Sequence, residues 1–71
     1  MAEEVLTQAP GNVWKVLVNE GDSVKAGDTL FILEVMKTEV PHDAESDGTV
    51  KRLHVKEEDA VDVGQLAVEI E

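Results

Sequence analysis

The chain has 71 residues, a length that suits one small domain with a thin hydrophobic core. Six basic residues stand against sixteen acidic ones, and the resulting net charge of −10 argues against a nucleic-acid-binding surface. Disulfides and thiolate metal sites are excluded because there is no cysteine, and a membrane-spanning segment is excluded because the longest apolar run covers only residues 30–33. The acidic N-terminus lacks an apolar signal core, so we expect one cytoplasmic domain over residues 1–71.

An internal repeat organises most of the chain. Residues 11–34 align without gaps with residues 48–71, at an offset of 37 residues. Two copies are too few for a solenoid, so the repeat predicts one domain made of two halves related by a pseudo-twofold axis. Eight of the 24 aligned pairs are identical: Gly11/Gly48, Val13/Val50, Val18/Val55, Glu20/Glu57, Asp22/Asp59, Val24/Val61, Gly27/Gly64 and Glu34/Glu71.

Both repeats have the pattern of short β-strands. Aliphatic residues recur at every second position in the pairs Val16 and Val18, Leu30 and Ile32, and Leu53 and Val55, which is the period of a strand. The turn-forming residues glycine, proline, aspartate and asparagine separate these segments at short intervals. No window has the periodicity of a helix of three turns. The sequence therefore predicts an all-β sandwich or flattened barrel, with the symmetry-related valines of the two repeats in one core.

The segment that joins the two repeats begins with a hairpin. Residues 30–35 and 38–40 both have strand character, so the chain reverses at Met36 and Lys37. Two-residue hairpin loops normally contain glycine, asparagine or aspartate, because the favoured turns need positive φ angles. Met36 and Lys37 break this rule, and a departure from turn chemistry is expected at a functional site. The lysine offers a primary amine that can be acylated, although an ordinary solvated lysine is the alternative.

The symmetry also predicts where this hairpin lies. A shift of 37 residues from Lys37 falls just outside either end of the chain. The symmetry-related counterpart of the hairpin is therefore the place where the two termini meet. We expect the hairpin tip at one end of the domain and both termini at the other.

The hairpin motif EVMKTEV at residues 34–40 and the run GDSVKAGD at residues 21–28 resemble the biotinyl/lipoyl attachment domain family. Within that family, the chain is similar to small biotin/lipoyl attachment proteins and biotin carboxyl carrier domains, from about residue 5 to residue 71. The resemblance implies a flattened barrel of two four-stranded antiparallel sheets. It also implies that Lys37 carries the prosthetic group covalently.

The resemblance implies biotin as the cofactor and lipoate as the alternative. The biotin branch of the family typically has Met-Lys-Met at the tip and the lipoyl branch Asp-Lys-Ala, so Met36 matches the biotin branch while Thr38 matches neither. A biotin protein ligase would activate biotin and load Lys37. We assign its recognition to the residues flanking that lysine, namely Glu34, Met36, Thr38 and Glu39.

A biotin carrier implies further partners and no catalysis of its own. The loaded arm would shuttle a carboxyl group between a biotin carboxylase and a carboxyltransferase, and the domain itself would be a monomer. Two alternatives remain open at this point. One is a lipoyl carrier of a 2-oxoacid dehydrogenase, and the other is an unmodified structural module of the same fold. An independent enzyme is the weakest hypothesis, because the chain shows no catalytic constellation.

Other polar and aromatic residues fit structural roles. His42 and His54 lack a metal-ligand pattern and are interpreted as partly exposed strand histidines. Residues 57–59 are interpreted as a solvated acidic turn, because the spacing of a calcium loop is absent. Trp14 is either a surface aromatic that contacts a partner or a partly buried one, since Lys51 stands at its place in the other repeat.

Overall fold

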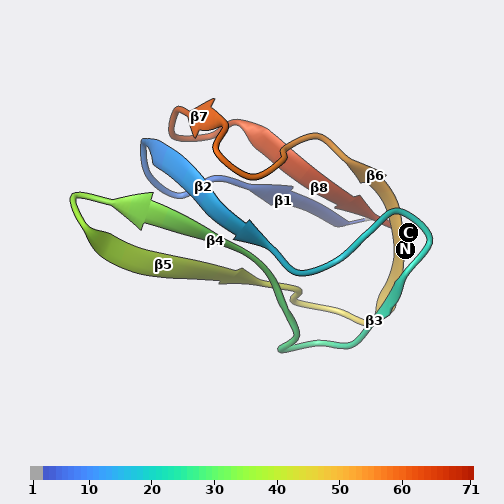
Figure 1. Cartoon of the computed structure of the whole chain (residues 1–71). Coiled ribbons are helices and arrows are strands. Elements are labelled where there is room, and N and C mark those ends of the chain that lie inside the picture. The colour runs from blue at the N-terminus through green and yellow to red at the C-terminus, as the bar shows by residue number, and fades with distance from the viewer. Residues whose placement is uncertain (1–2) are drawn as a thin grey trace.

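The computed structural model describes residues 3–71, and this part of the chain forms eight β-strands and no helix (Figure 1). The strands form two four-stranded antiparallel sheets, in the orders β1-β8-β6-β3 and β5-β4-β2-β7. The predicted all-β fold is confirmed. No helix of the described residues is long and apolar enough to cross a membrane. The bounds are β1 Glu3–Leu6, β2 Gly11–Val16, β3 Ser23–Val24, β4 Thr29–Val35, β5 Thr38–Asp43, β6 Gly48–Leu53, β7 Ala60–Val61 and β8 Leu66–Ile70.

The two sheets follow the repeat in the sequence. A shift of 37 residues carries β2 onto β6, β3 onto β7 and β4 onto β8, and it carries the end of β5 onto β1. The strand orders of the two sheets correspond under the same shift. Strands β2 and β6 have identical burial patterns, and both contain a β-bulge, at Trp14 and at Lys51. Two similar half-sequences therefore make two similar sheets that face each other across one core.

The core contains all the symmetry-related valines that the repeat singled out. It is closed on both sides by the sheets, and its most fully buried large side chains are Phe31, Leu30 and Leu33 of β4 and Ile70 of β8. The fourteen buried apolar residues are Val5, Val13, Val18, Val24, Leu30, Phe31, Leu33, Ala44, Val50, Val55, Val61, Ala67, Val68 and Ile70.

Two glycines that are identical in the repeats are explained by close packing of the backbone. A Cβ atom at Gly11 would lie 2.5 Å from the carbonyl oxygen of Glu34, and one at Gly48 would lie 2.8 Å from that of Glu71. These distances leave no room for a side chain, so only glycine lets the start of β2 approach the end of β4 this closely. Gly11 thus holds β2 against the strand that leads into the hairpin.

The turns are also built alike in the two halves. The Asp22 carboxylate accepts a hydrogen bond from the backbone N–H of Asn19 at 2.8 Å, and the Asp59 carboxylate accepts one from Lys56 at 3.0 Å. Such carboxylate-to-backbone bonds close a tight loop without help from a sheet. The acidic residues 57–59 are therefore part of a turn, as expected from the sequence.

The hairpin and the chain ends lie at opposite ends of the molecule. The molecule is elongated, with extents of 32 × 17 × 17 Å. In Figure 1 the β4–β5 tip lies at the left, while Glu71 and the start of β1 lie together at the right. Glu3 is paired with Ile70 there, which brings the start of β1 beside the end of β8. The layout predicted from the symmetry is confirmed.

Candidate functional site

The β4–β5 hairpin turns at the two residues expected from the sequence. Strand β4 ends at Val35, strand β5 begins at Thr38, and Met36 and Lys37 form the turn between them. Their φ angles are 49° and 66°, so both central residues are in the left-handed region, as in a type I′ turn. Each non-glycine residue in this region costs about 1–2 kcal/mol. Met36 and Lys37 are two of the three non-glycine residues with positive φ among residues 3–71, the third being Glu58 at 75°, so the tip is a strained turn at the place where a functional residue was expected.

The tip projects away from the core. Met36 is 93% exposed, a large value for an apolar side chain, and Lys37 is exposed beside it. Of residues 3–71, none forms an ion pair with Lys37. The amine of Lys37 is thus accessible to a protein that approaches the end of the domain.

The other residues proposed for ligase recognition surround this lysine. Glu34 and Glu39 are paired directly across the two strands, and Thr38 is paired with Val35 next to the turn. Glu34, Thr38 and Glu39 are all exposed. The structure therefore places the four predicted recognition residues at or next to the Met36-Lys37 turn, with the two glutamates directly opposite each other on neighbouring strands.

The hairpin is a firm support for its tip. Six residue pairs connect β4 and β5, and β4 is paired on its other edge with β2. Phe31 and Leu33 of β4 are fully buried, so the strand is fixed to the core just before it reaches the turn. This arrangement can present an amine in a fixed position.

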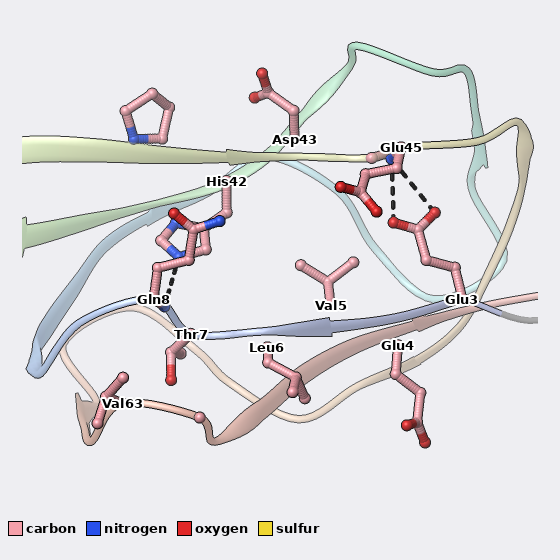
Figure 2. A pocket seen from close by; sticks show the side chains of 13 residues that line it. Glu3, Glu4, Val5, Leu6, Thr7, Gln8, His42, Asp43, Glu45 and Val63 are labelled. Atoms are coloured by element: carbon pink, nitrogen blue, oxygen red, sulfur yellow. Dashed lines mark hydrogen bonds between the residues drawn. The ribbon is translucent and has the colours of Figure 1, made fainter.

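A groove lies elsewhere on the molecule, between the edge strands β1 and β5 (Figure 2). Its volume is about 520 Å³, and neither Met36 nor Lys37 lines it. At one end the Glu3 carboxylate accepts hydrogen bonds from the backbone N–H groups of Glu45 and Ser46, as the dashed lines to Glu45 in Figure 2 show in part. These bonds tie the two edge strands together, so the groove is a seam between the two sheets.

His42 lies in this seam and is buried. The expectation of a partly exposed strand histidine is wrong, because only 2% of the residue is exposed. Its ring stacks on Phe31 with 4.6 Å between centroids. Its Nε2 accepts the Gln8 backbone N–H at 3.1 Å (Figure 2), and its Nδ1 donates to the carbonyl oxygen of Val40 at 3.2 Å in the neutral tautomer that satisfies both bonds.

The repeat contains a signal that would have predicted this burial. Residue 42 corresponds to residue 5 under the 37-residue shift, and Val5 is buried in β1. His42 therefore occupies an inward-facing position, and its hydrogen bonds compensate for placing a polar ring there. For His54 the expected exposure is confirmed and its ring contacts the Glu69 carboxylate at 2.8 Å, but the expected strand position is wrong, because the residue lies just after β6.

The burial of His42 predicts a loss of stability in acid. Burial lowers the pKa of His42 below 6.5, and the hydrogen bond to Val40 and the nearby Asp43 carboxylate oppose this only in part. Below about pH 6.5 the unfolded chain binds a proton at this residue more readily than the folded chain, so the free energy of unfolding decreases from pH 7.5 to pH 5.5. The measurement is urea unfolding across this range, with His42→Phe as the control. An equal pH slope in that variant would contradict the assignment to His42.

No metal site accompanies the hairpin. Among residues 3–71, no group of three or more histidine, cysteine, aspartate or glutamate side chains is placed to hold a metal ion.

Trp14, which the sequence left open between surface and partial burial, is 44% exposed, and the Lys15 ammonium lies 5.5 Å from its ring centre. The candidate site is therefore the exposed tip and the residues around it.

Comparison with known protein families gives one match that spans nearly the whole chain. The family described as "Biotin-requiring enzyme" matches residues 2–70. The "Biotin/lipoyl attachment protein" of Bacillus subtilis is 42% identical over 66 residues, which cover 93% of this chain and 90% of that protein. The "Biotinylated protein TB7.3 homolog" of Mycobacterium leprae is 39% identical over 66 residues, which cover 93% of this chain and 93% of that protein.

Solved structures show the same fold. The urea carboxylase of Kluyveromyces lactis matches with a TM-score of 0.92 and 37% identity, over 100% of this chain and 6% of that much longer one. The lipoyl domain of the Azotobacter vinelandii 2-oxoglutarate dehydrogenase complex matches with a TM-score of 0.78, over 94% of this chain and 95% of that domain. Its identity is 23%, so this second match concerns the fold alone.

Proposed function

The chain belongs to the biotin/lipoyl attachment domain family, and on this premise we propose that it is a biotin carrier domain in which Lys37 is the attachment residue. One observation carries the proposal. The amine of Lys37 is exposed at the strained tip of a hairpin that is anchored in the core, at the end of the molecule away from both termini. That geometry suits a residue that must be reached by several enzymes in turn.

A carrier of this kind contributes position and leaves the chemistry to its partners. Biotin must visit one site where it is carboxylated and a second site where the carboxyl group is transferred. Attachment to a protein that docks at both sites raises the effective concentration of biotin at each of them. We propose that residues 1–71 form one domain that performs this transfer as a monomer, between a biotin carboxylase and a carboxyltransferase.

The loading step requires a ligase and ATP. A biotin protein ligase would convert the biotin carboxylate to its adenylate, with release of pyrophosphate. The neutral amine of Lys37 would then attack the carbonyl carbon, so that an amide C–N bond forms and the C–O bond to the phosphate breaks. AMP leaves with the electron pair, and the amine loses a proton to solvent. In this proposal the ligase supplies the activation, because it forms the adenylate that Lys37 attacks.

We assign ligase recognition to the patch around the tip. Met36 offers an exposed, flexible thioether that can fill an apolar pocket. The paired carboxylates of Glu34 and Glu39 and the hydroxyl of Thr38 offer polar contacts beside it. Together they identify this hairpin to an enzyme that must ignore the four other lysines, which are Lys15, Lys25, Lys51 and Lys56.

The experiment that tests the proposed function compares the two cofactors on the unaltered protein. The unmodified chain is incubated with a biotin protein ligase, biotin and ATP, and separately with a lipoate ligase, lipoate and ATP. Intact mass identifies the product, and peptide mapping identifies the modified residue. We expect attachment of biotin at Lys37 and little or no lipoylation. Faster lipoylation would replace biotin by lipoate, and no reaction with either ligase would contradict the carrier function.

Cofactor choice is expected to depend on the residues next to Lys37. Thr38→Met restores the thioether that is typical of the biotin branch and should raise the rate of biotinylation. The double variant Met36→Asp with Thr38→Ala introduces a charge that an apolar pocket disfavours, and it should shift the tip towards lipoylation. Both rates are measured by intact mass at matched protein concentrations. Unchanged rates in both variants would show that cofactor choice lies outside these two positions.

A further inference from the structure

The outer face of the β5-β4-β2-β7 sheet, which carries the hairpin, has apolar residues at positions where the other sheet has charged ones. In β2 the bulge turns two consecutive residues outward, Trp14 and Lys15, between the inward-facing Val13 and Val16. Across the sheet, Ile32 of β4 is paired with Lys15 on one side and with Pro41 of β5 on the other. Trp14, Ile32 and Pro41, which we call the apolar strip, thus lie on the outer face of three neighbouring strands, with Lys15 between Trp14 and Ile32.

The other sheet has charged residues at all three corresponding positions. Under the 37-residue shift, Trp14 corresponds to Lys51, Ile32 to Glu69 and Pro41 to Glu4. Two of these residues have polar partners, since Lys51 forms an ion pair with Glu71 at 3.9 Å and Glu69 is within hydrogen-bond distance of His54 at 2.8 Å. The backbone is nearly the same in the two sheets, bulge included. Charged side chains therefore satisfy the fold at these positions, and the apolar strip has another purpose.

Carboxylates border the apolar strip. A shallow concavity of about 330 Å³ lies beside the indole of Trp14, and it is lined by Asn12, Glu34 and Glu58. Glu39 is paired with Glu34 in the next strand, between the strip and the tip. Trp14 has the carboxylates of Glu34 and Glu58 on one side and the Lys15 ammonium 5.5 Å from its ring centre. An exposed aromatic residue with more carboxylates than cations beside it matches a partner surface with an apolar slot flanked by lysine or arginine side chains. A second copy of the chain would oppose these carboxylates with its own.

We propose that this face, centred on Trp14, is the docking surface for the enzyme that acts on the loaded arm of Lys37, a biotin carboxylase with a basic surface around an apolar slot. The inference rests on the proposed biotin-carrier function. A partner seated on Trp14 and Ile32 contacts the sheet behind the tip. It leaves Lys37 at the border of the contact, free to extend its arm into a site. The ligase, in contrast, must contact the amine of Lys37 itself.

The test uses variants that borrow residues from the other half of the chain. Trp14→Lys and Ile32→Glu place the residue type of the symmetry-related position, so both variants are expected to fold. Trp14→Lys makes the net charge more positive and Ile32→Glu makes it more negative. An effect that both variants share therefore comes from loss of the apolar contact and not from the change in charge. The control is Leu17→Lys, because Leu17 is 51% exposed and follows β2 at the end away from the hairpin. Thermal melts confirm that each variant is folded.

Each protein is first loaded with a biotin protein ligase and then used as the substrate of a purified biotin carboxylase from the same source. We expect KM for the loaded carrier to rise at least about tenfold in Trp14→Lys and in Ile32→Glu, as for loss of an interface hot spot. Leu17→Lys should keep the unaltered KM, and all three should be loaded at the unaltered rate. An equal KM in all proteins would overturn the proposal. A lower rate of loading in the variants whose KM rises would assign this face to the ligase, and that result would also overturn the proposal.

A binding measurement decides the docking face without any loading. The unmodified 15N-labelled protein is titrated with unlabelled biotin carboxylase, and NMR follows the indole N–H of Trp14, which is the only tryptophan in the chain. Shifts or broadening at Trp14 and Ile32, with none at Lys51 and Glu69, support the proposal. An unaffected Trp14 signal overturns it. Failure of the unaltered protein to accept biotin in the loading step would contradict the carrier function. The NMR titration does not depend on that step, so the two failures can be told apart.

Discussion

Replacing Lys37 with arginine is expected to reduce biotin attachment by a biotin protein ligase to background. Arginine keeps the positive charge and much of the length of lysine, but its guanidinium group remains protonated and is not a nucleophile. The other four lysines stay in place, so the variant asks whether the ligase selects Lys37 alone. Product is measured by intact mass and on a streptavidin blot after incubation with ligase, biotin and ATP.

The matched control for this experiment is Lys25→Arg. Lys25 is also an exposed lysine beside a turn, where its backbone N–H donates to the Asp28 carboxylate at 2.9 Å, and its side chain has no part in the proposed site. We expect this variant to be loaded like the unaltered protein. Circular dichroism and a thermal melt establish that both variants are folded. A biotin signal that persists in Lys37→Arg would reject Lys37 as the attachment residue.

Truncation of Leu33 is expected to have the largest effect on stability. Leu33 is fully buried in β4, where it is paired with Val13 of β2 and Val40 of β5. Leu33→Ala removes buried methyl groups and leaves a cavity, which costs about 2–5 kcal/mol. A domain of this length has a total stability of about 4–11 kcal/mol, so a large share is lost. Urea unfolding at 25 °C measures the change.

Leu17→Ala is the control for this substitution, because it makes the same chemical change at a residue that is 51% exposed. We expect the free energy of unfolding to change by no more than about 0.5 kcal/mol. Losses of similar size in the two variants would contradict the assignment of Leu33 to the core. If Leu33→Ala is unfolded in buffer, the loss equals or exceeds the stability of the unaltered protein, which agrees with the expectation.

The comparison of the two halves separates requirements of the fold from requirements of function. Positions that are identical in the repeats have matching structural roles: Gly11 and Gly48 make close backbone contacts, and Asp22 and Asp59 close turns. Positions that differ include exposed ones where the fold accepts either residue, and Trp14 is such a position. The hairpin has no counterpart within the chain, because the symmetry-related place is occupied by the chain ends.

The repeat in the sequence was sufficient to predict the all-β fold, the pairing of the buried valines, and a hairpin tip opposite to the termini. Period-two alternation and turn residues are local signals that act within a few residues of one another, and the 37-residue offset relates the two halves directly in the sequence. The departure of Met36 and Lys37 from turn chemistry was also visible there, since neither residue favours the positive φ that both adopt.

The tertiary structure decided what depends on contacts between strands that are distant in sequence. His42 was assigned to a partly exposed strand face, but the approach of β1 buries its ring against Phe31 and supplies the Gln8 N–H as a partner. The strip of Trp14, Ile32 and Pro41 likewise joins three strands. The bulge at Trp14 shifts the register of β2 by one residue, so that Lys15 also faces outward and is paired with Ile32 in place of Trp14. A shift of one residue exchanges the two faces of a strand, and cross-strand pairing alone determines where that shift occurs.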